Sequence, residues 1–223
     1  MNVILVLICG MLVSLPLQAQ PLAPVATDVL QLGKALPQTP EMQALQLKQL
    51  QQPHNDTLRL HMAALYLQGA RKPGFDAWFH EAQSLLQSLS DQAKTTALYG
   101  LLQADIQQQQ HQFEDALNYL AKAQKLQPDD INALLMKNRI YLVQNNTAAA
   151  LAECKKLLGQ QELFLLSLCS LEVAGRQGKT QDSYKALQLL ARQQQSIPLA
   201  QQQWLIAVLA EQAEALHQPK QAR

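Results

Sequence analysis

Two alanines constrain the fold of this chain most strongly, because they lie in similar helical patterns about 34 residues apart. Ala116 has Leu120 and Ala123 at i+4 and i+7, which places the three on one face of a helix. Ala150 lies in a second such segment, with Cys154 at i+4. Two antiparallel helices approach closely only where a small side chain stands at their crossing point. The spacing, which we call the repeat interval, therefore predicts two consecutive helical hairpins.

The first of these hairpins also has a clear end. Pro128 stops its second helix, since the residue before a proline is pushed out of the α region, and Asp129 or Asp130 can cap the helix that follows. The alanine, the bulkier residue at i+4 and the proline resemble the A-x3-F…P portion of the tetratricopeptide repeat family. The resemblance covers about residues 58–158. In the second copy, Lys137 and Asn138 stand where the family prefers leucine and a small residue.

This resemblance implies the fold class. We expect an all-α protein, a right-handed α-solenoid of roughly four antiparallel helix hairpins. Few glycines, few aromatic residues and abundant leucine and alanine agree with an all-α composition. Glutamine occurs in runs such as 107–110, and we interpret these runs as solvated helix faces because apolar residues frame them at helical spacing.

The chain begins with an apolar run that has no charged residue, over residues 1–17, followed by Gln18, Ala19 and Gln20. About 15 apolar residues suit a signal-peptide core and fall short of the roughly 20 that cross a bilayer. We expect cleavage after Ala19 and a soluble protein in a Gram-negative periplasm, with no stable membrane insertion after cleavage. The alternative is an uncleaved anchor in the inner membrane. The expected organisation is a signal peptide (1–19), an extended leader with a short helix (20–38), the helical repeat domain (39–217) and a tail (218–223).

The flanks of the two clear copies show weaker helical patterns. Thr39 and Asn55 are predicted to cap helices. Ala63 and Ala104 are further apart than one repeat interval, so about seven residues have been added between these copies, and the turn sequence at 71–74 is the expected place. Toward the carboxyl end we expect a helix over 163–174 that Gly175 and Gly178 break, another that Thr180 caps, and a last helix whose Trp204 belongs to a terminal cap.

In tetratricopeptide folds the first helices of the hairpins line a concave groove that holds an extended peptide or a helix of a partner. Carried over to this chain, the resemblance implies a partner-binding groove of Leu60, Ala64, Leu67, Leu98, Leu101, Asp105, Gln108, Asn132, Leu135, Arg139 and Leu142. The set of basic and asparagine side chains that some relatives use to clamp a terminal carboxylate is not assembled, since only Asn138 and Arg139 resemble it.

Catalytic and metal-binding patterns are missing from the sequence. The five histidines are scattered over different segments, and no HExxH, CxxC, GxSxG or glycine-rich phosphate loop occurs. We therefore expect no enzyme activity, no cofactor and no metal site. The formal net charge of +1 gives no electrostatic argument for nucleic acid or an anionic membrane surface.

Two cysteines, Cys154 and Cys169, remain after removal of the signal peptide, an even count for an exported protein. The resemblance places them on adjacent helices that face each other, so they can form a disulfide. Two separate buried thiols that act as small hydrophobic residues remain the alternative.

Three functional hypotheses follow. The first is a non-catalytic periplasmic scaffold or adaptor that binds a protein or peptide in cell-envelope assembly or secretion. The second is a chaperone similar to the tetratricopeptide subunits of cytochrome c haem-ligation complexes, which hold apocytochromes. The third is a structural subunit that works as an oligomer.

Overall fold

The computed structural model describes residues 39–72, 74–160, 162–193 and 197–216 of the chain. Every regular element among these residues is a helix, so the all-α prediction is confirmed. The α-helices are α2 (Pro40–Gln51), α3 (Asp56–Ala70), α4 (Ala77–Gln87), α5 (Ala97–Gln109), α6 (Phe113–Leu126), α7 (Ile131–Val143), α8 (Thr147–Lys156), α9 (Leu163–Arg176), α10 (Thr180–Gln193) and α11 (Leu199–Ala215). Two short 3-10 helices, η1 (Ala93–Thr95) and η2 (Leu157–Gln160), accompany them.

The chain divides into two units, and all described residues belong to the second, which begins at Pro37. The expected signal peptide, leader and tail lie outside the described residues. None of the helices that the structure describes is both long enough and apolar enough to span a membrane.

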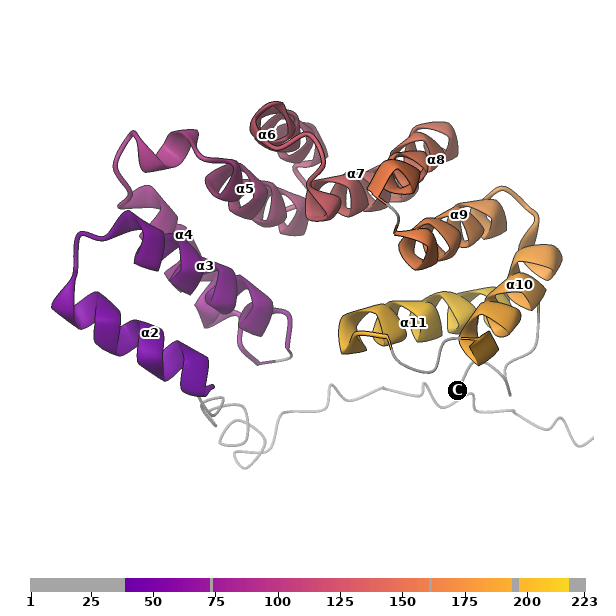
Figure 1. Cartoon of the computed structure of the whole chain (residues 1–223), viewed down its shortest axis with the longest axis horizontal. Helices are drawn as coiled ribbons and strands as arrows, with labels where there is room; N and C mark the ends of the chain where they lie inside the picture. The colour runs from indigo at the N-terminus through magenta and orange to yellow at the C-terminus, as the bar shows by residue number, and fades with distance from the viewer. Residues whose placement is uncertain (1–38, 73, 161, 194–196, 217–223) are drawn as a thin grey trace, which may run out of the picture. The chain divides into compact units, whose positions relative to one another are not determined.

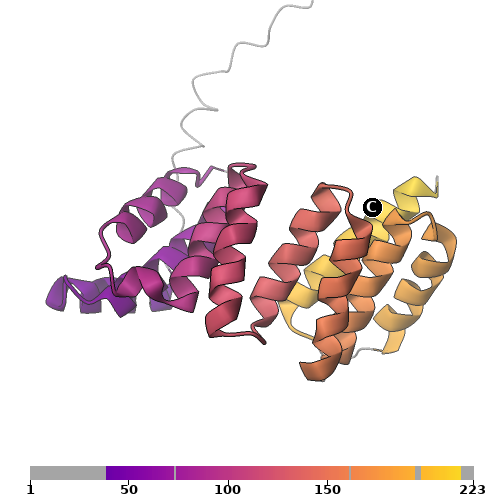
Figure 2. The same cartoon turned by 90° about the horizontal axis from the view of Figure 1, so that it is seen from above.

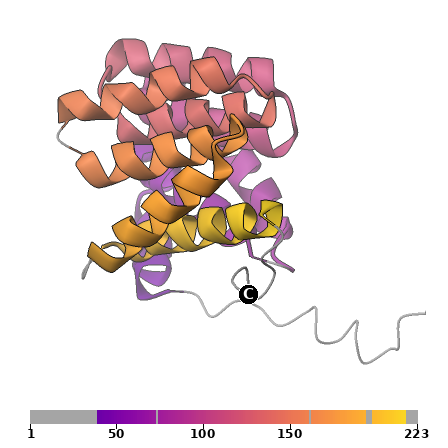
Figure 3. The same ribbon diagram turned by 90° about the vertical axis from the view of Figure 1, so that its right-hand side faces the viewer.

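Consecutive helices of the second unit pair into hairpins: α3 with α4, α5 with α6, α7 with α8 and α9 with α10. Figures 1 and 2 show the hairpins following one another in chain order, from indigo to orange. The first helix of each hairpin also contacts the first helix of the next, so that α3, α5, α7 and α9 form one continuous series. Helix α11 follows the last hairpin and contacts both α9 and α10 (Figure 3).

The hairpins repeat in their backbone as well as in their sequence. Helices α7 and α8 begin one repeat interval, about 34 residues, after α5 and α6, respectively. The turn inside each of the last three hairpins contains one residue with positive φ: His111 (60°), Asn145 (57°) and Gly178 (88°). In each turn the next backbone N–H donates to a carbonyl oxygen of the preceding helix end, at 2.7–3.0 Å. Because the same turn recurs at nearly the same interval, the hairpins are a true structural repeat.

A small buried residue marks the crossing point of each hairpin. Ala116 and Ala150 are fully buried, as the sequence predicts, and Ala82 occupies the same position one repeat interval before Ala116. Ser183 follows Ala150 at an interval one position shorter and is also buried. At i+4 from each of them comes a side chain with no exposed surface: Leu86, Leu120, Cys154 and Leu187. The core is thus a row of equivalent helix crossings.

Side chains that cap helix ends fix where several helices begin. The Thr39 hydroxyl accepts the backbone N–H of Met42, and the Asn55 side chain accepts that of Leu58, as predicted. Of the two candidate aspartates, Asp130 caps α7 by accepting the N–H of Ala133 at 2.8 Å. Such a bond satisfies one of the backbone donors that the first turn of a helix leaves free.

The first hairpin contains the extra residues that the sequence indicates. Ala63 and Ala82 lie about seven positions further apart than the equivalent Ala104 and Ala116 of the next, regular hairpin, so the addition lies within the α3–α4 hairpin. Its turn includes residue 73, which lies outside the described residues. Close approach of the two helices here depends on Gly69, because a Cβ at this position would collide with the Trp78 ring.

The boundary of α9 differs from the prediction. Gly175 lies inside this helix, which continues to Arg176, and only Gly178 forms the turn. Gly175 is required inside the helix by a close contact, because a Cβ at this position would collide with the Gln212 side chain of α11. Gln212 donates to the Leu171 carbonyl oxygen and accepts from the Ser183 hydroxyl, so it links α9, α10 and α11. The glycine therefore makes room for this contact and does not end the helix.

The crossing-point alanines generate a stability prediction. Ala116→Leu should lower the free energy of unfolding by about 1–3 kcal/mol, because extra methylenes in a packed core force neighbouring groups apart. Gln109→Leu, on an exposed position of α5, is the control and should change it by less than about 0.5 kcal/mol. Chemical denaturation of both variants measures the difference. Equal midpoints would contradict the assignment of Ala116 to a tightly packed crossing.

Candidate functional site

One surface that recurs with the repeat lies on α5 and α7. We call it the α5/α7 face and define it by seven of the predicted groove residues, on corresponding sides of the two helices: Leu98, Leu101, Asp105 and Gln108 on α5, and Asn132, Leu135 and Arg139 on α7. The helices contact each other. Asn132 and Arg139 are exposed, and the other five are half-buried. The face therefore offers a mixed apolar and polar surface.

The three leucines of this face also contribute to the core beneath it. Leu98, Leu101 and Leu135 are packed at the edge of three different clusters of buried residues. Their half-buried state holds each side chain in a fixed position while part of its apolar surface remains in contact with water. Such fixed apolar positions can bind a partner with little loss of side-chain entropy.

Three of the predicted groove residues do not lie on an accessible surface. Leu60 and Leu67 are 5% and 1% exposed and pack against Ala82 and Leu86 of α4 in the first core cluster. Leu142 is 9% exposed and belongs to the cluster around the α8–α9 junction. These three assignments are corrected: the leucines are core residues, since neighbouring helices cover them.

The remaining predicted residue, Ala64, is on α3 and is therefore not part of the α5/α7 face. It is half-buried on α3 and lines a cavity of about 430 Å³ together with Leu45 and Lys48 of α2 and His61 of α3. Helix α2 thus stands next to Ala64, and the cavity belongs to the α2–α3 pair.

Charged residues of the first helices form a series at equivalent positions. Asp105 on α5 is followed by Arg139 on α7 and then by Glu172 on α9, with the second step one position shorter than the first. Asp105 is bound by Arg71 Nη2 at 2.6 Å, an ion pair that joins the end of α3 to α5. Arg139 makes no hydrogen bond or ion pair with any residue that the structure describes. Its charge nevertheless acts on the Glu172 carboxyl of α9, whose pKa it lowers.

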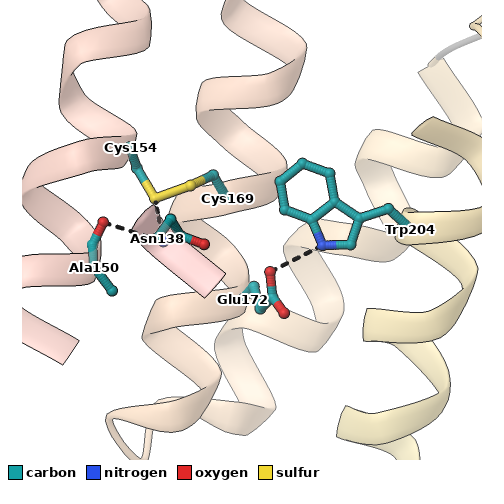
Figure 4. Close-up of a disulfide and its surroundings, with 6 residues drawn as sticks. All are labelled: Asn138, Ala150, Cys154, Cys169, Glu172 and Trp204. Carbon is teal, nitrogen blue, oxygen red and sulfur yellow. Dashed lines mark hydrogen bonds between the residues drawn. A yellow bond between two sulfur atoms is a disulfide. The ribbon is translucent and has the colours of Figure 1, made fainter. Parts of the chain in front are cut away.

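Glu172 was not among the predicted site residues, and its environment is unusual. The Trp204 indole Nε1 of α11 donates to Glu172 Oε2 at 2.9 Å (Figure 4). Burial raises the pKa of the Glu172 carboxyl above the ordinary glutamate value, while the Trp204 hydrogen bond and the charge of Arg139 oppose this shift. The sequence contained a signal for this residue: one repeat interval after Arg139 comes Val173, and Glu172 is its immediate neighbour. The predicted role of Trp204 in the terminal cap is extended, because it also binds a charged group of α9.

A disulfide joins Cys154 of α8 to Cys169 of α9, with the two Cα atoms 5.7 Å apart (Figure 4). The structure thus contains the bridge, one of the two alternatives that the sequence left open. Both cysteines are fully buried among Leu134, Leu165 and Val173. The bridge fixes α9, the helix that carries Glu172, directly to α8.

Asn138 has a structural role beside this disulfide. It is 2% exposed, and its Nδ2 donates to the Ala150 carbonyl oxygen and to Cys154 Sγ, both at 3.1 Å. Its neighbour Lys137 is half-buried and pairs with the buried Glu153 at 3.2 Å. Lys137 and Asn138 are therefore satisfied inside the α7–α8 hairpin, and Asn138 is not available to clamp a ligand.

The described residues contain no group of three or more histidine, cysteine, aspartate or glutamate side chains that could hold a metal ion.

A cavity of about 80 Å³ lies near Glu172 and is lined by Arg176, Glu211 and Gln212. Arg176 and Glu211 pair with each other at 2.7 Å. This ion pair and the hydrogen bond from Trp204 to Glu172, which also lines the cavity, connect α9 to α11.

Comparison with known proteins gave no match: no family model matches the chain, and neither a curated protein nor a solved structure does.

The disulfide should contribute measurably to stability. Replacing both Cys154 and Cys169 by alanine should lower the free energy of unfolding by about 3 kcal/mol, the value that the chain-entropy model gives for a loop of about 15 residues. Denaturant titration measures the loss, and the unmodified protein titrated with reductant is the matched comparison. Free thiols at both positions in non-reducing peptide mapping would contradict the bridge.

The environment of Glu172 predicts a pH effect. Because its carboxyl has a raised pKa in the folded state, the folded state binds the proton more tightly, and stability from this group is lost as the pH rises through that pKa. Glu172→Gln should therefore be more stabilising, relative to the unmodified protein, at about pH 7 than at about pH 4, where the glutamate is protonated. The groups facing the carboxyl are Trp204, Arg139, Arg176 and Glu211.

Melting temperatures at the two pH values test this effect, with Glu214→Gln on an exposed position of α11 as the control. A Glu172→Gln effect that is the same at both pH values would show that burial does not penalise the charge.

Proposed function

We propose that this chain is a non-catalytic scaffold of the tetratricopeptide type that binds a protein or peptide partner. Three recurring features support the proposal: the regular steps between helix starts, the positive-φ turns and the small crossing-point residues. These are features expected of stacked helix pairs of this kind. We further propose that the hairpins wind into a right-handed solenoid, as in that family.

The observation that carries the proposed function is the α5/α7 face. It presents half-buried leucines beside an exposed arginine that forms no ion pair with a described residue, on two successive helices of the series. Partly exposed apolar side chains surrounded by polar ones are typical of protein-binding surfaces, in which arginine is also enriched. A surface built at equivalent positions of a repeat can extend along several hairpins and so bind an elongated partner segment.

We also propose that the protein works in the bacterial cell envelope, in assembly or secretion, after export to the periplasm. The support is the apolar run at residues 1–17, of signal-peptide length, and the buried Cys154–Cys169 disulfide. Disulfides of this kind form and persist in oxidising compartments such as the periplasm.

Site-specific photo-cross-linking in cells tests the scaffold function. A photoreactive amino acid at Gln108 or Asn132 of the α5/α7 face should trap another envelope protein, and the same label at Asn118, on an exposed position of α6, should not. Neither face position is buried, so the label leaves the core intact. Labelling equal to that of the Asn118 control would contradict a binding role for this face. Cross-links only to a second copy of the chain would favour the oligomeric subunit instead.

A further inference from the structure

Helix α11 shows how this protein binds a helix at the positions that define the α5/α7 face. The repeat makes Leu101 on α5 equivalent to Leu135 on α7 and to Leu168 on α9, with the second step one position shorter than the first. The charged positions Asp105, Arg139 and Glu172 follow the same steps. The three helices can therefore be compared position by position.

On α9, both positions are occupied by α11. Leu168 has no exposed surface and shares a core cluster with Leu205 and Val208 of α11. Glu172 accepts the hydrogen bond from Trp204 of the same helix. Helix α11 thus binds Leu168 through Leu205 and Val208, and it binds Glu172 through the neighbouring Trp204.

On α7, the equivalent positions remain accessible. Leu135 is half-buried, and Arg139 is exposed and forms no hydrogen bond or ion pair with a described group, although its charge lowers the pKa of Glu172 on α9. On α5, Leu101 is likewise half-buried, whereas Asp105 is already paired with Arg71. The α5/α7 face therefore keeps two leucines and one cation available for a partner.

We propose that the α5/α7 face binds an amphipathic helix of a partner as α9 binds α11, with a carboxylate of that helix on Arg139. This inference rests on the proposed scaffold function and specifies its partner. The helix follows from α11, which binds equivalent positions in helical form. The carboxylate follows from charge. On α9 the acceptor Glu172 binds the N–H donor of Trp204, whereas on α7 the equivalent Arg139 is a charged donor, which a carboxylate acceptor matches.

A designed peptide tests the inference on the full chain. The probe has the sequence of α11, LAQQQWLIAVLAEQAEA, with its tryptophan replaced by glutamate and a fluorescent label at one end. It keeps the residues of Leu205 and Val208 and offers a carboxylate at the position of Trp204. This carboxylate can pair with Arg139 on α7.

The full chain should bind this peptide in a fluorescence anisotropy titration, and Arg139→Glu should weaken binding by about tenfold or more. A second peptide with lysine in place of the glutamate should bind the Arg139→Glu variant more tightly than the unmodified chain. Lys185→Glu, the same charge change on an exposed position of α10, is the matched control and should leave binding unchanged. Circular dichroism should show equal helicity for all variants, because Arg139 and Lys185 are exposed.

Three results would overturn the inference: no binding of the glutamate peptide, equal binding to the Arg139→Glu variant, or equal binding of a peptide with proline at the position of Ile206, which cannot form a continuous helix. If one of these occurs while photo-cross-links at Gln108 and Asn132 persist, the scaffold function stands and the helical partner is wrong. If the cross-links are absent while the peptide binds with the expected dependence on Arg139, the cellular function is wrong and the binding mode stands.

Discussion

Close approach of two helices at one small residue is the constraint on which the rest of this structure depends. Ala82, Ala116 and Ala150 have no exposed surface, and each leaves room for the helix that crosses it. The constraint recurs because each hairpin buries only one side of its helices and needs the next hairpin to cover the other. The positive-φ turns of the last three hairpins recur at nearly the same interval.

The last hairpin shows how the array is fixed at its carboxyl end. The Cys154–Cys169 disulfide attaches α9 to α8, and the Gln212 side chain ties α11 to α9 and α10. Gly175 and Ser183 are small where the Gln212 amide must fit. Covalent and hydrogen-bonded contacts here add to the apolar packing that serves at the preceding junctions.

Several pairs of charged residues hold the fold together. Lys137 with Glu153, Arg71 with Asp105, and Arg176 with Glu211 each join two helices. Arg139 has no such described partner, although it lies at the repeat position that is bound on both neighbouring helices of the series. A long, charged side chain that forms no ion pair within the described fold is available to bind a ligand, which is why the proposed functions centre on it.

The sequence by itself determined the all-α class, the repeat interval and the caps at Thr39 and Asn55, because these depend on side chains that are near one another in the chain or recur along it. The tertiary structure decided which repeat positions remain accessible. Leu60 and Leu135 were both predicted to line the groove, yet the first is core and the second half-exposed, since burial depends on which neighbouring helices cover each of them. The bond from Trp204 to Glu172 likewise joins residues far apart in the chain, and only the packing of α11 on α9 brings them together.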